Sequence, residues 1–134
     1  LTEPRHTLSI NTCTISQYAA LAALTGPQEP VDAMIEEYAE RRAWLMPALS
    51  EAGFSYGHPG GAFYIYTNIS SSGLSSPLFC ERLLQETGVM LFPGTMFGDT
   101  STDYIRISYL QPLPLIQEAM QRITSFTSRT RSVT

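Results

Sequence analysis

Arg106 is the residue whose type and setting could do the clearest chemistry. The alternation over 104–109 predicts a strand that places Ile105 and Ile107 on one face and Arg106 on the other. A guanidinium group is always ionised, and its planar fork of N–H donors matches a carboxylate. Held on a strand, Arg106 would be a well-positioned clamp for an anion. From spacing alone, a strand with one solvated face is the more frequent explanation.

Two turns that contain glycine are further candidates for contact with a ligand. Residues 93–98 carry a proline and two glycines between two predicted strands, and loops of this kind often face ligands. On spacing alone, an ordinary connection between strands is favoured there. Gly60 and Gly61 precede an aromatic strand predicted over 62–66, where they allow either close approach of the backbone to a ligand or simply a turn.

The absence of one residue type excludes several kinds of chemistry. All eight basic residues are arginines, and the sequence of 134 residues contains no lysine. This excludes a phosphate-loop lysine, a lysine general base and a lysine that forms a Schiff base. The formal net charge of −4 offers no electrostatic attraction for nucleic acid. No apolar run approaches the roughly 20 residues of a membrane span.

The cysteines and histidines stand alone in the sequence. Cys13 and Cys80 are far apart, and so are His6 and His58, which predicts neither a metal site nor a disulfide framework. Reduced cysteines fit an intracellular protein, and we expect a cytoplasmic location. Charged residues make up only 15% of the chain, which indicates that part of its surface is normally covered.

Apolar periodicity predicts an α/β fold of the α+β-like kind. A small sheet of about three strands packs with helices and is preceded by a long helix of the type that joins two domains. The first thirty residues have too little apolar surface for a core of their own. Residues from Thr127 onward predict a frayed tail. The predicted helices cover about 14–24, 30–52, 78–87 and 112–126, and the predicted strands cover 62–66, 89–92 and 104–109.

Four sequence motifs follow one another in a characteristic order. They are SQYAALAAL at 16–24, the pair Arg41-Arg42 followed by Leu49, GGAFY at 60–64, and PGTMFG at 93–98 followed by YIRISY at 104–109. Together they resemble the C-terminal part of class I and II aminotransferases, which are pyridoxal-phosphate enzymes of fold type I. Each motif alone is weak, but four in register over about 7–126 are specific. The resemblance favours ligand binding by Arg106 over a solvated strand face.

The resemblance implies roles for two residues of this chain. Arg106 matches the family's arginine that binds the α-carboxylate of the substrate. Asn11 matches an asparagine near the dimer interface and the neighbouring active site, close to cofactor or substrate. Residues 1–27 would be a remnant of the large cofactor-binding domain, 28–127 the small domain, and 128–134 a flexible tail.

The resemblance also implies partners that this chain lacks. The parent enzyme would be a homodimer that uses pyridoxal 5'-phosphate to transfer an amino group between an amino acid and a 2-oxo acid. Its cofactor lysine would lie in a missing N-terminal large domain, upstream of Leu1. Without that lysine we expect this chain alone to be inactive and not to retain the cofactor. We expect no metal, nucleic-acid or membrane partner.

Two alternatives to a transaminase stay open, because a fold does not determine a reaction. One is a non-catalytic ligand-binding or interaction module of the same fold. The other is a decarboxylase or lyase, which would also need the missing domain. The sequence does not determine which amino acid the parent enzyme prefers, since the side-chain pocket would be spread over both domains.

Overall fold

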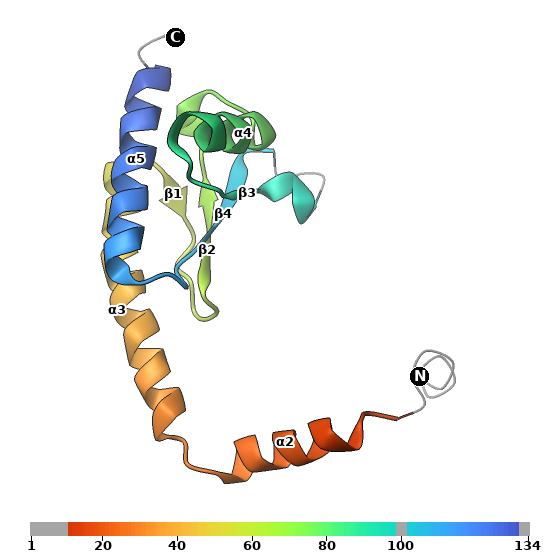
Figure 1. Cartoon of the computed structure of the whole chain (residues 1–134). Coiled ribbons are helices and arrows are strands. Elements are labelled where there is room, and N and C mark those ends of the chain that lie inside the picture. The colour runs from red at the N-terminus through yellow and green to blue at the C-terminus, as the bar shows by residue number, and fades with distance from the viewer. Residues whose placement is uncertain (1–10, 99–101, 132–134) are drawn as a thin grey trace. The chain divides into compact units, whose positions relative to one another are not determined.

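A computed structural model of the chain describes residues 11–98 and 102–131 (Figure 1). Within them, helices pack with a four-stranded antiparallel sheet, which confirms the predicted α/β fold with one strand more than expected. The helices are α2 (Thr14–Thr25), α3 (Glu29–Glu51), α4 (Ser76–Thr87) and α5 (Leu113–Arg131), with 3-10 turns η1 (Ser70–Ser72) and η2 (Gly94–Met96). The strands are β1 (Ser55–Tyr56), β2 (Tyr64–Asn68), β3 (Phe92–Pro93) and β4 (Tyr104–Ser108).

The chain divides into two compact units, Leu1–Ile35 and Glu36–Thr134. The boundary lies inside α3, eight residues after the expected one between 27 and 28. In the first unit, α2 buries none of its residues. Its four large apolar side chains are 57–81% exposed, namely Ile15, Tyr18, Leu21 and Leu24. The described part of this unit therefore has no core of its own. The sequence also predicts a loop or an incomplete element over residues 1–13; residues 11–13 belong to no helix or strand, and 1–10 lie outside the described residues.

The sheet has the strand order β1-β2-β4-β3, so β4 lies between β2 and β3. Arg106 is opposite Tyr66 of β2 on one side and opposite Phe92 of β3 on the other. Ile105 and Ile107 are buried, whereas Arg106 is only partly buried. The predicted alternation of β4 is confirmed, and Arg106 lies in the middle of the sheet on the face away from the core.

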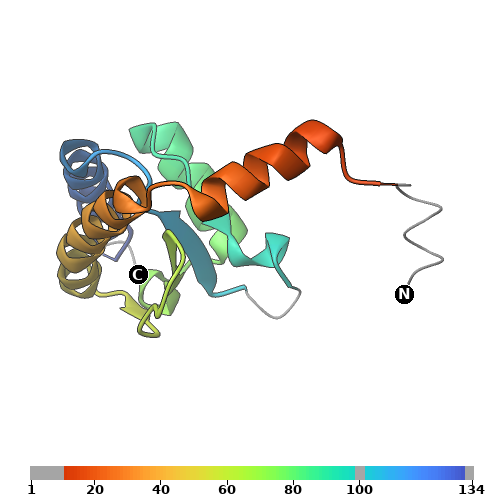
Figure 2. The ribbon, with the colours of Figure 1, turned by 90° about the horizontal axis from the view of Figure 1, so that it is seen from below.

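The second unit has one continuous core between the sheet and its helices. In Figures 1 and 2, α5 and the second half of α3 lie side by side, and α4 packs beside α5. Burying an aliphatic or aromatic side chain contributes about 1.5–3 kcal/mol, so this core holds the sheet against the helices. The helices contribute Leu45, Leu49, Phe79, Leu83, Ile116, Met120, Ile123 and Phe126, and the sheet contributes Ile65, Ile105 and Ile107.

Two short edge strands differ from the sequence-based expectation. The strand expected at 89–92 is reduced to Phe92–Pro93, and β1 was not expected at all. Each is two residues long, which is too short for an alternating pattern. Pro93 lacks an N–H donor, and its place in a strand is tolerated because β3 lies at the edge of the sheet. The central strand expected at 62–66 forms at 64–68.

The C-terminal helix is longer than expected. A frayed tail was expected from Thr127 onward, but α5 continues to Arg131, so the flexible tail expected over 128–134 is helical as far as that residue. Thr127 and Thr130 are buried, and their hydroxyl groups donate hydrogen bonds back to carbonyls of the same helix. Apolar periodicity missed this turn because its inward-facing residues are threonines.

A threonine of the core provides a test of the packing. Thr67 is fully buried on the core face of β2, and its Oγ1 is the one buried side-chain polar atom without a hydrogen-bond partner in the described part of the chain. Thr67→Val keeps the shape and removes the unpaired hydroxyl, so the free energy of unfolding should rise by about 1 kcal/mol. Urea denaturation measures the change. Thr127→Val is the matched control and should give no gain, because the Thr127 hydroxyl donates to the Ile123 carbonyl at 2.5 Å. A less stable Thr67→Val variant would contradict this account of the core.

Candidate functional site

The site is built around Arg106, whose guanidinium lies over three aromatic rings. The Arg106 Cζ atom is 4.2 Å from the ring centroid of Phe97 and 5.2 Å from those of Tyr64 and Phe92. These rings come from three elements: Tyr64 from β2, Phe92 from β3, and Phe97 from the turn after η2. A cation over an aromatic face is attracted to the ring, so the three rings hold the guanidinium in place.

Arg106 differs from the other arginines in its polar contacts. It forms no hydrogen bond or ion pair with any described residue, and its surroundings leave its N–H donors available. Each of the other five arginines whose side chains the structure describes donates at least one hydrogen bond. These are Arg41 to Glu37 and Leu110, Arg42 to Pro59, Arg82 to Glu86, Arg122 to Glu118 and Thr87, and Arg129 to Glu86.

The described side chains that lie closest to Arg106 on this face are aromatic. Tyr66 and Tyr104 lie on it with their rings stacked, 5.2 Å apart at the centroids and 6° from parallel. Tyr64 and Tyr104 are each 37% exposed, so this face is open to solvent at those positions. Aromatic contacts occupy none of the N–H groups of a guanidinium. The arrangement can therefore accept a carboxylate without first breaking an internal ion pair.

Hydrogen bonds from Tyr109 hold the two residues that directly precede β2. Its hydroxyl donates to the Ala62 carbonyl at 2.6 Å, and its N–H donates to the Phe63 carbonyl at 3.0 Å. Ala62 has a φ of 62°, a left-handed conformation that is uncommon for a residue other than glycine. Arg41 in turn donates to the Leu110 carbonyl at 2.6 Å. These contacts join α3, the end of β4 and the start of β2, and so set the position of Tyr64 beside Arg106.

Of the two glycine-containing turns predicted to contact a ligand, one contributes a residue to the site around Arg106. The turn at 93–98 brings Phe97 over Arg106, so this motif belongs to the same site. At Gly60 and Gly61, an added Cβ would meet no atom within 4 Å, and the left-handed residue of that turn is Ala62 instead. The sequence pattern did not reveal the role of Tyr109, because only the hydrogen bond to Ala62 distinguishes it from an ordinary core tyrosine.

The remaining candidates from the sequence are Asn11, the cysteines and possible metal ligands. Asn11 is exposed at the start of the first unit, and its proximity to a cofactor or substrate stays a prediction. Cys13 and Cys80 are both free. Burial raises the pKa of the Cys80 thiol to about 11, so it stays protonated and unreactive at neutral pH. Within 11–98 and 102–131, no three His, Cys, Asp or Glu side chains gather as metal ligands, and no helix is long and apolar enough to cross a membrane.

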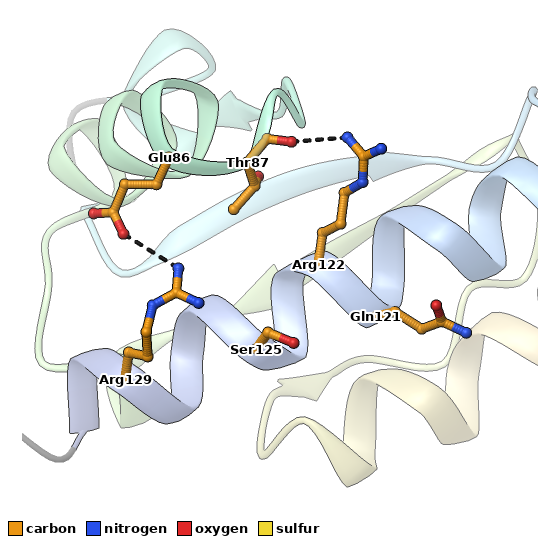
Figure 3. Close-up of a pocket in the computed structure, with 6 residues that line it drawn as sticks. All are labelled: Glu86, Thr87, Gln121, Arg122, Ser125 and Arg129. Carbon is orange, nitrogen blue, oxygen red and sulfur yellow. Dashed lines mark hydrogen bonds and ion pairs between the residues drawn. The ribbon is translucent and has the colours of Figure 1, made fainter.

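A groove of about 440 Å³ between α4 and α5 contains two arginines (Figure 3). Arg122 donates to the Thr87 carbonyl at 2.9 Å, and Arg129 donates to the Glu86 carboxylate at 3.3 Å. Arg122 thereby satisfies a carbonyl at the end of α4, where helices leave carbonyls unpaired. Hydrogen bonds from Arg82 and Arg129 lower the pKa of Glu86. The two arginines of this groove already have partners on α4, so they join the two helices, and the groove is a weaker candidate site than Arg106.

Comparisons with known proteins show the family of the chain. The family model described as aminotransferase class I and II matches residues 5–123. The chain belongs to this family. Over 116 residues it is 39% identical to aromatic-amino-acid aminotransferase 2 of Thermococcus litoralis, which covers 84% of this chain and 30% of that protein. Over 109 residues it is 38% identical to LL-diaminopimelate aminotransferase of Desulforudis audaxviator, which covers 81% of this chain and 28% of that protein.

The fold of this aminotransferase chain also matches solved structures. It superposes on MJ0684 from Methanococcus jannaschii with a TM-score of 0.83 at 36% identity, covering 93% of this chain and 33% of that one. The active site of that protein is described as similar to those of kynurenine aminotransferases. The aminotransferase chain thus spans about a third of the length of the proteins it matches. The α/β fold and the motifs along 5–123 are those of the family.

The Tyr109 contacts make a testable contribution to stability. In Tyr109→Phe, loss of the hydrogen bond to Ala62 should lower the free energy of unfolding by about 1 kcal/mol near neutral pH. Burial raises the pKa of Tyr109, against an opposing effect of Arg42. An acid with a raised folded-state pKa stabilises the fold fully below its unfolded pKa of about 10, and loses that contribution as pH rises through the folded value. The Phe variant should therefore lose less stability than the wild type as the pH rises above about 10.

Chemical denaturation at neutral and alkaline pH measures both effects. Tyr104→Phe is the matched control, because Tyr104 is 37% exposed and its hydroxyl bonds to no described residue. Its stability should change by less than about 0.5 kcal/mol. Equal stability of wild type and Tyr109→Phe at neutral pH would show that the bond to Ala62 does not hold this turn.

Proposed function

We propose that this chain is the substrate-binding small domain of an aminotransferase that transfers an amino group between an amino acid and a 2-oxo acid. In this proposal Arg106 binds the α-carboxylate of both substrates, the amino acid and the 2-oxo acid. The observation that supports this most is the state of the Arg106 guanidinium, which lies on a central strand of the sheet without a hydrogen-bond or ion-pair partner among the described residues. Both substrates of a transaminase carry the carboxylate that such a group recognises.

The geometry of the Arg106 guanidinium suits a carboxylate. A guanidinium and a carboxylate are both planar, and two parallel N–H···O bonds fix the angle between them as well as the distance. Fixing the carboxylate orients the reacting carbon next to it, which is how binding geometry lowers a barrier. Arg106 is suited to this task because the strand pairs with neighbours on both sides and does not move as a loop would.

The residues of this chain do not fit the attachment of pyridoxal 5'-phosphate. That cofactor is held through a lysine, and none of the 134 residues is a lysine. We therefore infer that the cofactor is held by residues outside this chain, in the large domain of a homodimeric parent enzyme, and that the chain alone is inactive. Asn11 would lie close to the neighbouring active site of that dimer. Free cysteines are consistent with a cytoplasmic location.

The exposed apolar surface of α2 supports a missing large domain. A helix that is apolar on most sides is normally buried in a larger protein. Ile15 and Leu24 are 79% and 81% exposed at its two ends. We infer that residues 1–27 pack on the large domain, and that 28–127 form the small domain that carries Arg106.

Substitution of Arg106 tests the proposed function in the full-length enzyme that contains this chain. Arg106→Lys keeps the charge but loses the bidentate fork, so binding of the substrate carboxylate should weaken by about 1.5–3 kcal/mol. Steady-state kinetics should show this as a roughly ten- to hundredfold loss of kcat/KM for both the amino acid and the 2-oxo acid.

The matched control is Arg82→Lys, since Arg82 of α4 forms an ion pair with Glu86 and its guanidinium lies over Phe126 of α5. Its kinetics should stay close to those of the wild type. Unchanged kinetics in Arg106→Lys would rule out the assigned role. That result would favour a non-catalytic function for this face of the sheet.

A further inference from the structure

We propose that Phe97 is a positioning residue, whose ring holds the Arg106 guanidinium in the orientation that receives the substrate carboxylate. This inference rests on the proposed function of Arg106 and adds a second residue to it. Phe97 follows η2 and belongs to no strand. Nevertheless, its ring centroid is the nearest of the three to the Arg106 Cζ atom, at 4.2 Å compared with 5.2 Å for Tyr64 and Phe92.

The surroundings of Phe97 indicate that its main contact is the guanidinium. Its side chain is 49% exposed and is absent from the buried core. Phe92, in contrast, is held opposite Arg106 by the pairing of β3 with β4. Phe97 is held by the turn itself, in which its N–H donates to the Gly94 carbonyl at 2.8 Å, and Gly94 is buried. The turn therefore presents an aromatic ring to a cation and leaves half of that ring in solvent.

An aromatic contact suits an arginine that must stay available to a ligand. A carboxylate or carbonyl partner would fix the guanidinium but would also occupy the N–H donors that bind substrate. A ring attracts the cation through its face and occupies none of them. A free arginine side chain samples many rotamers, and restricting them before the ligand arrives lowers the entropy lost on binding. Phe97 adds to this restriction the one ring of the three that does not come from a strand.

The experiment compares Phe97→Leu, Phe97→Tyr and Arg106→Lys in the full-length enzyme that contains this chain. Leucine keeps the apolar volume and removes the ring, whereas tyrosine keeps the ring. The measurements are KM and kcat for the amino acid substrate, and the inhibition constant of propionate, which has a carboxylate but no amino group. Met96→Leu is the control for the turn, because Met96 is 64% exposed and is not part of the buried core.

The expected result is a loss that depends on the ring. Phe97→Leu should raise KM and the inhibition constant of propionate by about two- to fivefold, the size of one exposed cation–π contact, with kcat nearly unchanged. Phe97→Tyr should restore both values, and Met96→Leu should leave them at the wild-type level.

The outcomes separate this inference from the proposed function. If Arg106→Lys raises both constants but Phe97→Leu does not, Phe97 has no positioning role and the proposed function stands. If Phe97→Tyr is impaired as much as Phe97→Leu, the ring is not what matters and the inference is wrong. If Arg106→Lys changes neither constant, the proposed function and the inference fall together.

Discussion

The rest of this structure depends on one feature: Arg106 is an arginine that forms no ion pair with any described residue. The Arg106 cation is partly buried on the sheet, and such a group is usually paired with a carboxylate. Here the neighbouring groups are aromatic rings from β2, β3 and the turn after η2. These rings stabilise the cation and leave its donors for a molecule from outside. In the proposed function, a carboxylate substrate supplies the partner that this cation lacks among the described residues.

The fold provides this arrangement through the two faces of one sheet. Alternation along β4 directs Ile105 and Ile107 into the core, where they pack with α3, α4 and α5. The same alternation directs Arg106 to the opposite face. The core therefore fixes the strand, and the strand fixes the position of the arginine. Tyr109 extends this order to the start of β2 through its bonds to Ala62 and Phe63, which place Tyr64 beside Arg106.

Much of the fold could be predicted from the sequence because its longer elements carry strong patterns. The helices and the central strands have apolar periodicity, and the alternation around Arg106 was sufficient to place it away from the core. The edge strands are two residues long and carry no such pattern. The last turns of α5 bury threonines, which hydrophobicity does not reveal. The motif resemblance pointed to the carboxylate role of Arg106, whereas spacing alone favoured a solvated face.

The rest of the site depends on contacts between residues distant in sequence. No local pattern distinguishes Phe97 from an ordinary aromatic residue of a loop, and only the folded sheet brings it over Arg106. The left-handed conformation of Ala62 could not be predicted from the sequence either. Gly60 and Gly61 precede it, and glycine is the residue type that usually adopts this conformation. The sequence thus indicated which residue is the candidate for ligand binding, and the structure shows which residues surround it.

The most direct test of the account is a crystal structure of the full-length enzyme with a bound 2-oxo acid. The account predicts that both carboxylate oxygens accept hydrogen bonds from the Arg106 guanidinium at about 2.7–2.9 Å, with the rings of Phe97, Tyr64 and Phe92 still in place around it. A carboxylate bound by another residue, with Arg106 turned away from it, would contradict the central claim.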